Sequence, residues 1–287
     1  MKILINSILI AGMFSLVSCA TFRTMGVNAI APSFNEIIES AYKMNDSLIL
    51  KEGIPSNIIL LEGLLGFSPD NRDLLALTAQ AYCSYALGFI EDTDPERAKK
   101  LYLRGRDFGL RALKVNKKFR KIVNKEKDFQ KAAAVLDEEY IPDLFWTGFC
   151  WASWLNLSKK DPVALYDISN IVALMERVKD LDGKYFNGGP HLFFAMYYSG
   201  LPVPMGGPEK AQAEFDKVFE ITGGKFLMAK AFYARFYATI IKDEELFDKT
   251  IEEVLNTPSD IDPNLAVMNE IAKTKARHFR NQRMDFF

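Results

Sequence analysis

Histidine, cysteine and clustered carboxylates are the residue types most often used in catalysis and metal binding, and this chain holds few of them in suitable patterns. Its two histidines, His191 and His278, lie far apart, and neither belongs to the His-Glu-x-x-His pattern that seats zinc. The neighbouring carboxylates of Glu138-Glu139 and Glu244-Glu245 would point about 100° apart on a helix, so they would not share one site. We therefore predict no catalytic residue, no metal site and no cofactor, and we interpret the chain as a protein that is not an enzyme.

The N-terminus places a cysteine in a pattern with chemical meaning. Positive charge at Met1 and Lys2 is followed by an apolar stretch that closes on Leu16-Val17-Ser18-Cys19, which is the layout of a secretory signal. This stretch is shorter than the roughly 20 apolar residues that span a membrane. Leu16, Ser18 and Cys19 resemble the lipobox of bacterial lipoproteins, in which the sulfur carries a diacylglycerol before the chain is cleaved. The alternative is an uncleaved anchor with an incidental cysteine.

This interpretation sets the expected domain boundaries. Residues 1–18 would be a lipoprotein signal peptide, residues 19–32 the lipidated Cys19 and a tether, and residues 33–287 one helical domain. A diacylglycerol and an N-acyl chain exceed the two signals that stable attachment needs, so we expect a protein anchored in the cell envelope and facing the periplasm. Ala20, rather than Asp, after the cysteine favours the outer membrane over the inner one.

The other two cysteines, Cys83 and Cys150, lie in apolar helical surroundings. We interpret them as buried apolar side chains. An exported domain would also permit a disulfide, and the sequence leaves that alternative open because it does not show the Cα separation.

The spacing of apolar residues predicts an all-α fold. Apolar residues recur at intervals of three and four between Pro and Gly breaks, whereas no segment alternates with a period of two. Three helix faces are predicted on this basis: Phe34, Ile37, Ala41, Met44 and Leu48; Leu74, Leu77, Ala81, Tyr85 and Phe89; and Ala98, Leu101, Gly105, Phe108 and Ala112. Asp-Pro and Gly-Pro pairs mark helix starts at Asp94, Asp161, Gly189, Gly207 and Asp262.

Two segments of the chain also echo each other. "PERAKKLY" at Pro95–Tyr102 and "PEKAQAEF" at Pro208–Phe215 share Pro, Glu, a base, Ala and an aromatic residue four positions after the Ala. This Ala-x3-aromatic step, extended by Gly105, is typical of the second helix of a tetratricopeptide (TPR) unit, where small residues let the paired helix approach. The sequence therefore predicts irregular TPR-like helical hairpins stacked into one compact helical-repeat domain.

Two long segments carry a more specific resemblance. Ile54–Leu113 and Gly200–Ala238 are similar to the T-component (TatT) lipoproteins of tetratricopeptide-associated TRAP transporters, and the resemblance extends over nearly the whole mature chain. It implies a periplasmic lipoprotein that assembles as a homotrimer with a central pore. It also implies a partner, the TRAP-type periplasmic substrate-binding protein, which passes a small organic ligand to a membrane permease.

The charge distribution suggests where a partner would dock. Between Glu96 and Lys127 the chain has thirteen Lys or Arg and three acidic residues, although the mature chain as a whole is nearly neutral, which argues against a dedicated nucleic-acid binder. Arg97, Arg104 and Arg111 recur every seven residues, and Lys118 and Lys121 come after them. We predict a docking patch for an acidic partner or for phospholipid headgroups; the alternative is an ordinary solvated face.

Aromatic residues gather in two other segments. We consider six of them as walls of a pore or cleft for an apolar or carboxylate ligand: Trp146, Trp151, Trp154, Phe194, Tyr197 and Tyr198. Packing in the core or at a trimer contact is the alternative, because aromatic residues dominate both. Two functions are therefore weighed: an accessory transport protein that docks a substrate-binding component, and a structural helical-repeat envelope lipoprotein that acts as a scaffold without ligand transport.

Overall fold

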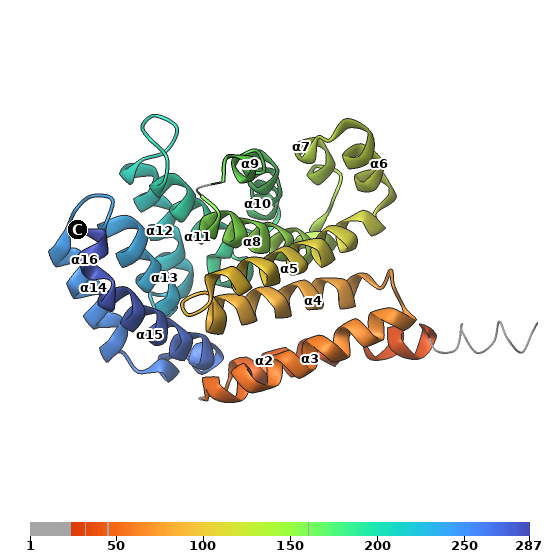
Figure 1. The fold of residues 1–287 in the computed structure, drawn as a ribbon, viewed down its shortest axis with the longest axis horizontal. Coiled ribbons are helices and arrows are strands. Elements are labelled where there is room, and N and C mark those ends of the chain that lie inside the picture. The colour runs from red at the N-terminus through yellow and green to blue at the C-terminus, as the bar shows by residue number, and fades with distance from the viewer. Residues whose placement is uncertain (1–23, 32, 45, 160) are drawn as a thin grey trace, which may run out of the picture.

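The computed structural model describes residues 24–287 apart from residues 32, 45 and 160 (Figure 1). This part of the chain is built of helices and contains no β-strand, which confirms the predicted all-α class. None of its helices is both long enough and apolar enough to cross a membrane. The predicted signal peptide and the predicted lipid site Cys19 lie outside the described residues.

The N-terminal half is a stack of helix pairs built around α4 and α5 (Figure 1). Residues 24–30 are helical. After them come α2 (Ser33–Tyr42), α3 (Ser47–Phe67), α4 (Arg72–Tyr85) with a π-helical segment (Ala86–Ile90), α5 (Pro95–Val115), α6 (Lys117–Glu126), α7 (Phe129–Ala133), a 3₁₀ turn (Glu138–Tyr140) and α8 (Ile141–Leu157). The α4–α5 hairpin is packed between α3 on one side and α8 on the other.

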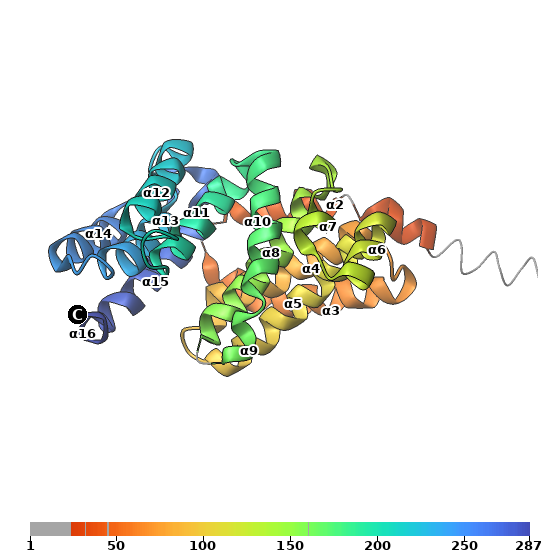
Figure 2. The same ribbon diagram turned by 90° about the horizontal axis from the view of Figure 1, so that it is seen from above.

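The C-terminal half continues the same pattern. It contains α9 (Pro162–Leu165), α10 (Ile168–Asp182), α11 (Tyr185–Ser199), α12 (Pro208–Thr222), α13 (Leu227–Phe232) with a π-turn (Tyr233–Ala238), α14 (Glu244–Asn256), two 3₁₀ turns (Ser259–Ile261 and Pro263–Leu265), α15 (Ala266–Asn281) and α16 (Arg283–Phe286). α11 pairs with α12, and α15 packs on α13 and α14. Seen from above, the helix pairs run from α6 and α7 at one end to α14 at the other (Figure 2).

Small residues set the spacing of α4, α5 and α8. A Cβ added at Gly105 would lie 3.1 Å from Tyr82 Cβ, and one at Gly109 would lie 2.2 Å from Thr147 Oγ1. The helices therefore touch where the sequence predicted a close approach.

Cys83 of α4 and Cys150 of α8 form a disulfide in the buried core, with Cα atoms 5.5 Å apart. Both cysteines are thus buried, as interpreted, and they are also paired.

The predicted helix starts open elements of different lengths. The Asp94 carboxylate accepts a hydrogen bond from the Arg97 backbone N–H at 3.0 Å and so caps α5, and Gly207 precedes Pro208 at the start of α12. The Asp161 and Asp262 pairs open only the short α9 and a 3₁₀ turn. Pro190 lies inside α11, shortly after three residues with left-handed backbone, Phe186–Gly188, so regular helix resumes at the predicted point.

The first predicted helix face was wrong. Helix α2 ends at Tyr42, and Asp46 caps a new helix by accepting a hydrogen bond from the Leu48 N–H at 2.8 Å. Ile37, Met44 and Leu48 therefore belong to no common buried stripe, and all three side chains are exposed.

Two hydrophobic clusters form the core, one centred on α4, α5 and α8 and the other on α12 to α15. A buried ionic contact joins the two halves. Lys275 of α15 is 1% exposed and binds Glu91 and, at 2.8 Å, Asp92 in the α4–α5 connection. Tyr102 donates a 2.6 Å hydrogen bond to the same Glu91, so the ammonium and the carboxylate are both satisfied inside the protein.

Candidate docking site

The predicted arginines lie on the exposed side of α5. A spacing of seven residues is close to two helical turns, and Arg97, Arg104 and Arg111 are accordingly all exposed. Each guanidinium lies over an aromatic ring: Arg97 over Tyr85 at 5.9 Å, and Arg104 and Arg111 over Phe108 at 5.6 and 5.2 Å from the ring centroid. The rings hold these long side chains near the surface of α5.

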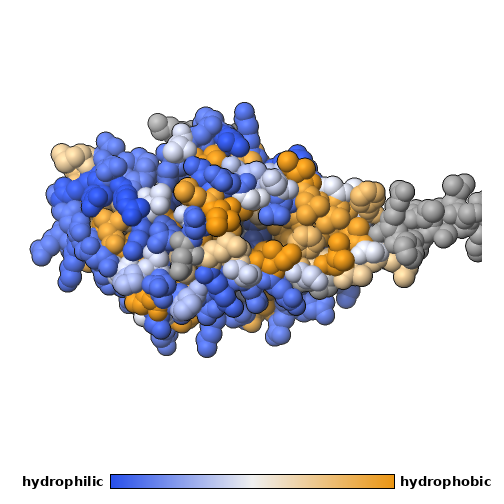
Figure 3. Space-filling view, turned by 90° about the horizontal axis from the view of Figure 1, so that it is seen from below, coloured by the Kyte–Doolittle hydropathy of each residue, from blue (hydrophilic) through white to orange (hydrophobic). Residues whose placement is uncertain are grey.

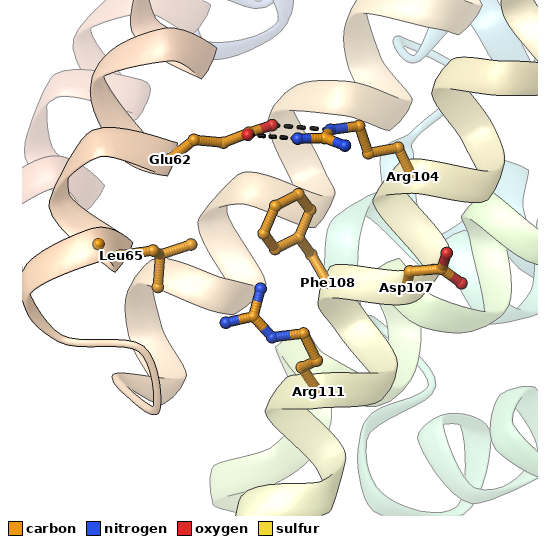
Figure 4. Close-up of a pocket in the computed structure, with 7 residues that line it drawn as sticks. Glu62, Leu65, Arg104, Asp107, Phe108 and Arg111 are labelled. Carbon is orange, nitrogen blue, oxygen red and sulfur yellow. Dashed lines mark hydrogen bonds and ion pairs between the residues drawn. The ribbon is translucent and has the colours of Figure 1, made fainter.

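Arg104 and Arg111 line a pocket of about 390 Å³ between α3 and α5, which we call the α3–α5 pocket (Figure 4). Its lining residues are Glu62, Leu65 and Gly66 from α3 and Arg104, Asp107, Phe108 and Arg111 from α5. Leu65 and Phe108 give the pocket an apolar base between two cations and two carboxylates. Two of the three predicted arginines, Arg104 and Arg111, are therefore part of a concave, charged site, and Arg97 does not line it.

The Arg104 side is neutralised within the pocket. The Arg104 guanidinium binds both oxygens of Glu62, with Nε to Oε1 at 2.8 Å, and Tyr82 donates a hydrogen bond to the same carboxylate. The hydrogen bond from Arg104 holds the pKa of Glu62 below its usual value. Burial raises the pKa of Tyr82 to about 12, so it stays a hydrogen-bond donor.

The Arg111 side keeps more capacity to bind an anion. One Nη of Arg111 donates to the Pro69 carbonyl at 2.9 Å, and this residue forms no ion pair within the described part of the chain. The nearby Asp107 is paired with Arg106 at 2.7 Å. Arg111 is therefore held in place but has no carboxylate partner among the described residues, so it could bind a carboxylate of a partner protein.

The predicted patch does not stay together along the chain. Asn116 ends α5 and caps α6 by accepting hydrogen bonds from the Lys118 and Phe119 N–H groups. Lys118 and Lys121 are exposed on α6 and do not line the α3–α5 pocket. The basic segment therefore presents two surfaces, one at the pocket and one on α6.

Three of the six aromatic candidates lie in the core. Trp146 packs against Phe186 with ring centroids 4.8 Å apart, and Trp151 donates its indole N–H to Asp167 at 2.9 Å. Phe194 is buried beneath Lys179, whose Nζ lies 4.1 Å from the ring centroid. The placement of these three residues supports the core alternative, since none has appreciable exposed surface in this chain.

The other three aromatic candidates are half-buried. Trp154, Tyr197 and Tyr198 pack against the first core cluster and keep part of their surface exposed. A role in contacting a ligand or a neighbouring subunit remains a prediction for them.

The structure contains a second pocket, also of about 390 Å³, that the sequence analysis did not predict. It lies between α12, α13 and α14 and is lined by Phe219, Gly224, Lys230, Tyr233, Leu246, Lys249, Thr250 and Glu253. Lys230 binds Glu253, and Tyr233 donates to Gln212 at 2.8 Å. The sequence did not predict this pocket, because its lining residues come from separate segments of the chain. The Ala-x3-aromatic echo pointed only to Phe215, one turn before Phe219.

Both histidines lie beside carboxylates from other segments of the chain. His191 Nδ1 lies 2.5 Å from one oxygen of Glu214, and Lys179 Nζ lies 3.2 Å from the other. Burial opposes ionisation of Glu214, but the hydrogen bonds with His191 and Lys179 and the charge of Lys179 outweigh it, so the pKa of Glu214 is lowered. His278 Nε2 lies 3.8 Å from Asp92. Within the described residues, no group of three or more His, Cys, Asp or Glu side chains is arranged to hold a metal ion.

Asp143 is a buried carboxylate that sequence reasoning did not single out. It lies on α8, and its side chain is 3% exposed and 3.9 Å from Arg72 Nε. Its Oδ1 receives no hydrogen bond from the described residues. Burial raises the pKa of Asp143 to about 7. Asp143 therefore has one oxygen without a hydrogen bond from the described residues, and it lines neither pocket.

Comparison with known proteins gives the family. An uncharacterized protein of Treponema pallidum (strain Nichols) is 22% identical over 261 residues, a match that covers 85% of this chain and 81% of the relative. The model of the TRAP transporter T-component family matches residues 43–287, which include the two segments that carry the resemblance in the sequence. The chain belongs to the TRAP transporter T-component family.

Proposed function

We propose that this protein is a lipid-anchored accessory component of a TRAP-type transporter that docks the soluble substrate-binding component in the periplasm. Membership of the T-component family is the observation that carries the proposal, because it ties the chain to a transporter of the cell envelope. The lipobox-like Leu16 to Cys19 supports attachment through the Cys19 sulfur. The resemblance of the sequence supports a homotrimer, and Ala20 supports the outer membrane.

The docking surface in this proposal is the rim of the α3–α5 pocket together with the exposed lysines of α6. Arg111 is held by Pro69 and Phe108 and carries no ion pair among the described residues. Lys118 and Lys121 add exposed positive charge. An acidic edge on the binding protein would be attracted to both surfaces, and the attraction would act mainly on the rate of encounter.

A small organic ligand would be sheltered near the docking surface or in the second pocket. The second pocket combines the rings of Phe219 and Tyr233 with the ammonium group of Lys249. An aromatic floor beside a cation suits a ligand with an apolar body and a carboxylate. Tryptophan and tyrosine fluorescence during titration with hydrophobic carboxylates would report such binding.

Sedimentation and binding kinetics test the docking proposal directly. The mature protein should sediment as a trimer and shift to a larger complex when the cognate TRAP-type binding protein is added. The association rate should fall as ionic strength rises. The variants Lys118→Glu/Lys121→Glu and Arg111→Glu should each slow association several-fold, because each reverses charge on the proposed surface.

The double variant Lys184→Glu/Lys225→Glu is the matched control, since both lysines are exposed and lie outside the basic segment. It should leave the association rate unchanged. A monomer that ignores the binding protein would contradict the proposal and favour the scaffold function. Equal slowing by both double variants would show that total charge matters, rather than this surface.

A further inference from the structure

The outer face of α3 is apolar although no element of the described chain covers it. The arc holds nine residues at the helical period of 3.6: Leu48, Ile49, Glu52, Ser56, Ile59, Leu60, Gly63, Gly66 and Phe67. The five large apolar side chains among them are 49–74% exposed. Glu52 is the one charge on this arc. We call this surface the outer face of α3.

The opposite side of the same helix is an ordinary core face. Ile58, Leu61 and Leu65 are buried against α4. The end helix of a stacked repeat normally presents a polar outer side to water. The outer face of α3 departs from that rule, and large contiguous apolar patches on a protein surface mark an interaction.

The apolar surface extends toward the N-terminal end of the described chain. The Thr24 hydroxyl donates to the Phe67 carbonyl at 3.1 Å, and the Ser68 hydroxyl donates to Asn28 Oδ1 at 3.0 Å, so residues 24–30 lie against the end of α3. Met25 and Ile30 are also exposed. Figure 3 shows the hydrophobic surface beside the point where the described chain begins.

We propose that the outer face of α3 rests on the lipid bilayer, with the helix axis parallel to the membrane. The inference depends on the proposed lipid at Cys19. Thr24 comes five residues after Cys19, and an extended chain spans at most about 3.6 Å per residue. The Phe67 end of α3 is therefore held within roughly 18 Å of the anchored sulfur.

Charge at one edge of the face agrees with a membrane as the partner. Lys51 precedes Glu62 by about three helical turns and so points to the same side of α3. Lys51 is exposed at this edge of the face. A cation that borders an apolar face meets lipid phosphates when the face enters the interface between headgroups and acyl chains.

Lipid-attached quenchers test this orientation in the full, lipidated chain. A fluorophore on Ile59→Cys, the most exposed position of the face, would be compared with the same fluorophore on Met284→Cys, which is 84% exposed on α16. Both chains would be bound to phosphatidylethanolamine and phosphatidylglycerol vesicles. We expect nitroxide lipids to quench the Ile59 probe at least several-fold more than the Met284 probe. We also expect the Ile59 probe to be shielded from aqueous iodide.

The other outcomes overturn the proposal in distinguishable ways. If the chain floats with vesicles and iodide reaches both probes equally, the face is in water and only the orientation is wrong. If the Ile59 probe is shielded from iodide without lipid quenching, a second protein surface covers the face. If the chain does not float with vesicles, the anchor at Cys19 fails and the orientation fails with it. Because both positions are exposed, the substitutions should leave the fold intact, which circular dichroism would confirm.

Discussion

Helices α3 and α5 have the same length of 21 residues and flank the same helix α4, yet their outer sides differ in chemistry. α5 contains nine charged residues, and α3 contains three. α5 buries small and apolar residues and turns its arginines outward, whereas α3 exposes isoleucine, leucine and phenylalanine. Both helices pack on α4, and α5 also packs on α8, so the comparison concerns the sides that these neighbours leave uncovered.

The contrast shows how glycine acts in the two helices. In α5, Gly105 and Gly109 face other helices, and an added Cβ would collide with them. In α3, an added Cβ at Gly53, Gly63 or Gly66 would meet nothing within 4 Å. The glycines of α5 are therefore required by packing, and those of α3 are not required by any contact within the described chain.

The largest effect should come from filling the space at Gly109. In Gly109→Ala the new methyl group would lie 2.2 Å from Thr147 Oγ1 and 3.1 Å from the Thr147 Cα, so backbone as well as side chain must move. We expect a loss of about 3 kcal/mol in the free energy of unfolding, at the upper end of overpacking effects. Urea unfolding, monitored by circular dichroism, measures it. Gly109→Ala with Thr147→Ala would be the relief control, because it removes the Oγ1 that the new methyl group would meet. Wild-type stability of the single variant would contradict the tight α5–α8 contact.

The second effect is a dependence of stability on pH that originates beside α5, on α8. The unfolded chain releases the Asp143 proton near its ordinary pKa of 3.8, and the folded protein keeps it up to about 7. The stability from this proton is complete below pH 4 and is lost as pH rises through 7. Between pH 6 and pH 8 the loss should be about 1.4 kcal/mol, which is one pKa unit of linkage.

Asp143→Asn removes this titration and is the test of it. The unfolding free energy of the variant should change less between pH 6 and pH 8 than that of the parent chain. Arg72 lies 3.9 Å away and loses its buried carboxylate in the variant, so the absolute stability of the two chains differs and only their slopes are compared. Equal slopes would show that Asp143 is ionised in the folded protein at pH 6.

The fold was predictable where local rules and packing agree. Asp94 before Pro95 caps α5, and the face from Ala98 to Ala112 is largely buried, because capping and helical spacing depend on neighbours in the chain. The same rules failed at Asp46, which starts a new helix inside a stretch of suitable spacing. Apolar spacing does not reveal such a break, because the spacing of Phe34 to Leu48 persists across it.

The site was predictable only in part. The seven-residue repeat placed Arg104 and Arg111 on one side, but it gave no sign of Glu62, whose contact depends on how α3 lies against the hairpin. The disulfide between Cys83 and Cys150 was equally hidden, because it joins two helices that are distant in sequence. Aromatic residues were ambiguous for another reason: Trp146 and Trp154 look alike in the sequence, yet one is buried and the other half-buried.

The third effect concerns the pair that connects α3 with α5. Arg104 is 55% exposed, so its bond to Glu62 should contribute about 1 kcal/mol or less, in the range of surface ion pairs. A double-mutant cycle with Glu62→Gln and Arg104→Gln would give the coupling energy. The coupling should weaken in high salt. A salt-independent coupling would indicate that the pair is effectively buried.

Gly63→Ala should have the smallest effect on the free energy of unfolding. Its sign should be opposite to that of Gly109→Ala, which sharpens the contrast between the two helices. The methyl group meets nothing, and alanine is favoured over glycine inside a helix, so stability should rise by about 0.5–1 kcal/mol. Urea unfolding measures the gain.

The variant also separates two occupants of the outer face of α3. Against fluid acyl chains one more methyl group is tolerated, and lipid quenching at Ile59 should not change. A second helix packed on the bare backbone of Gly63 would be pushed away, and self-association would weaken.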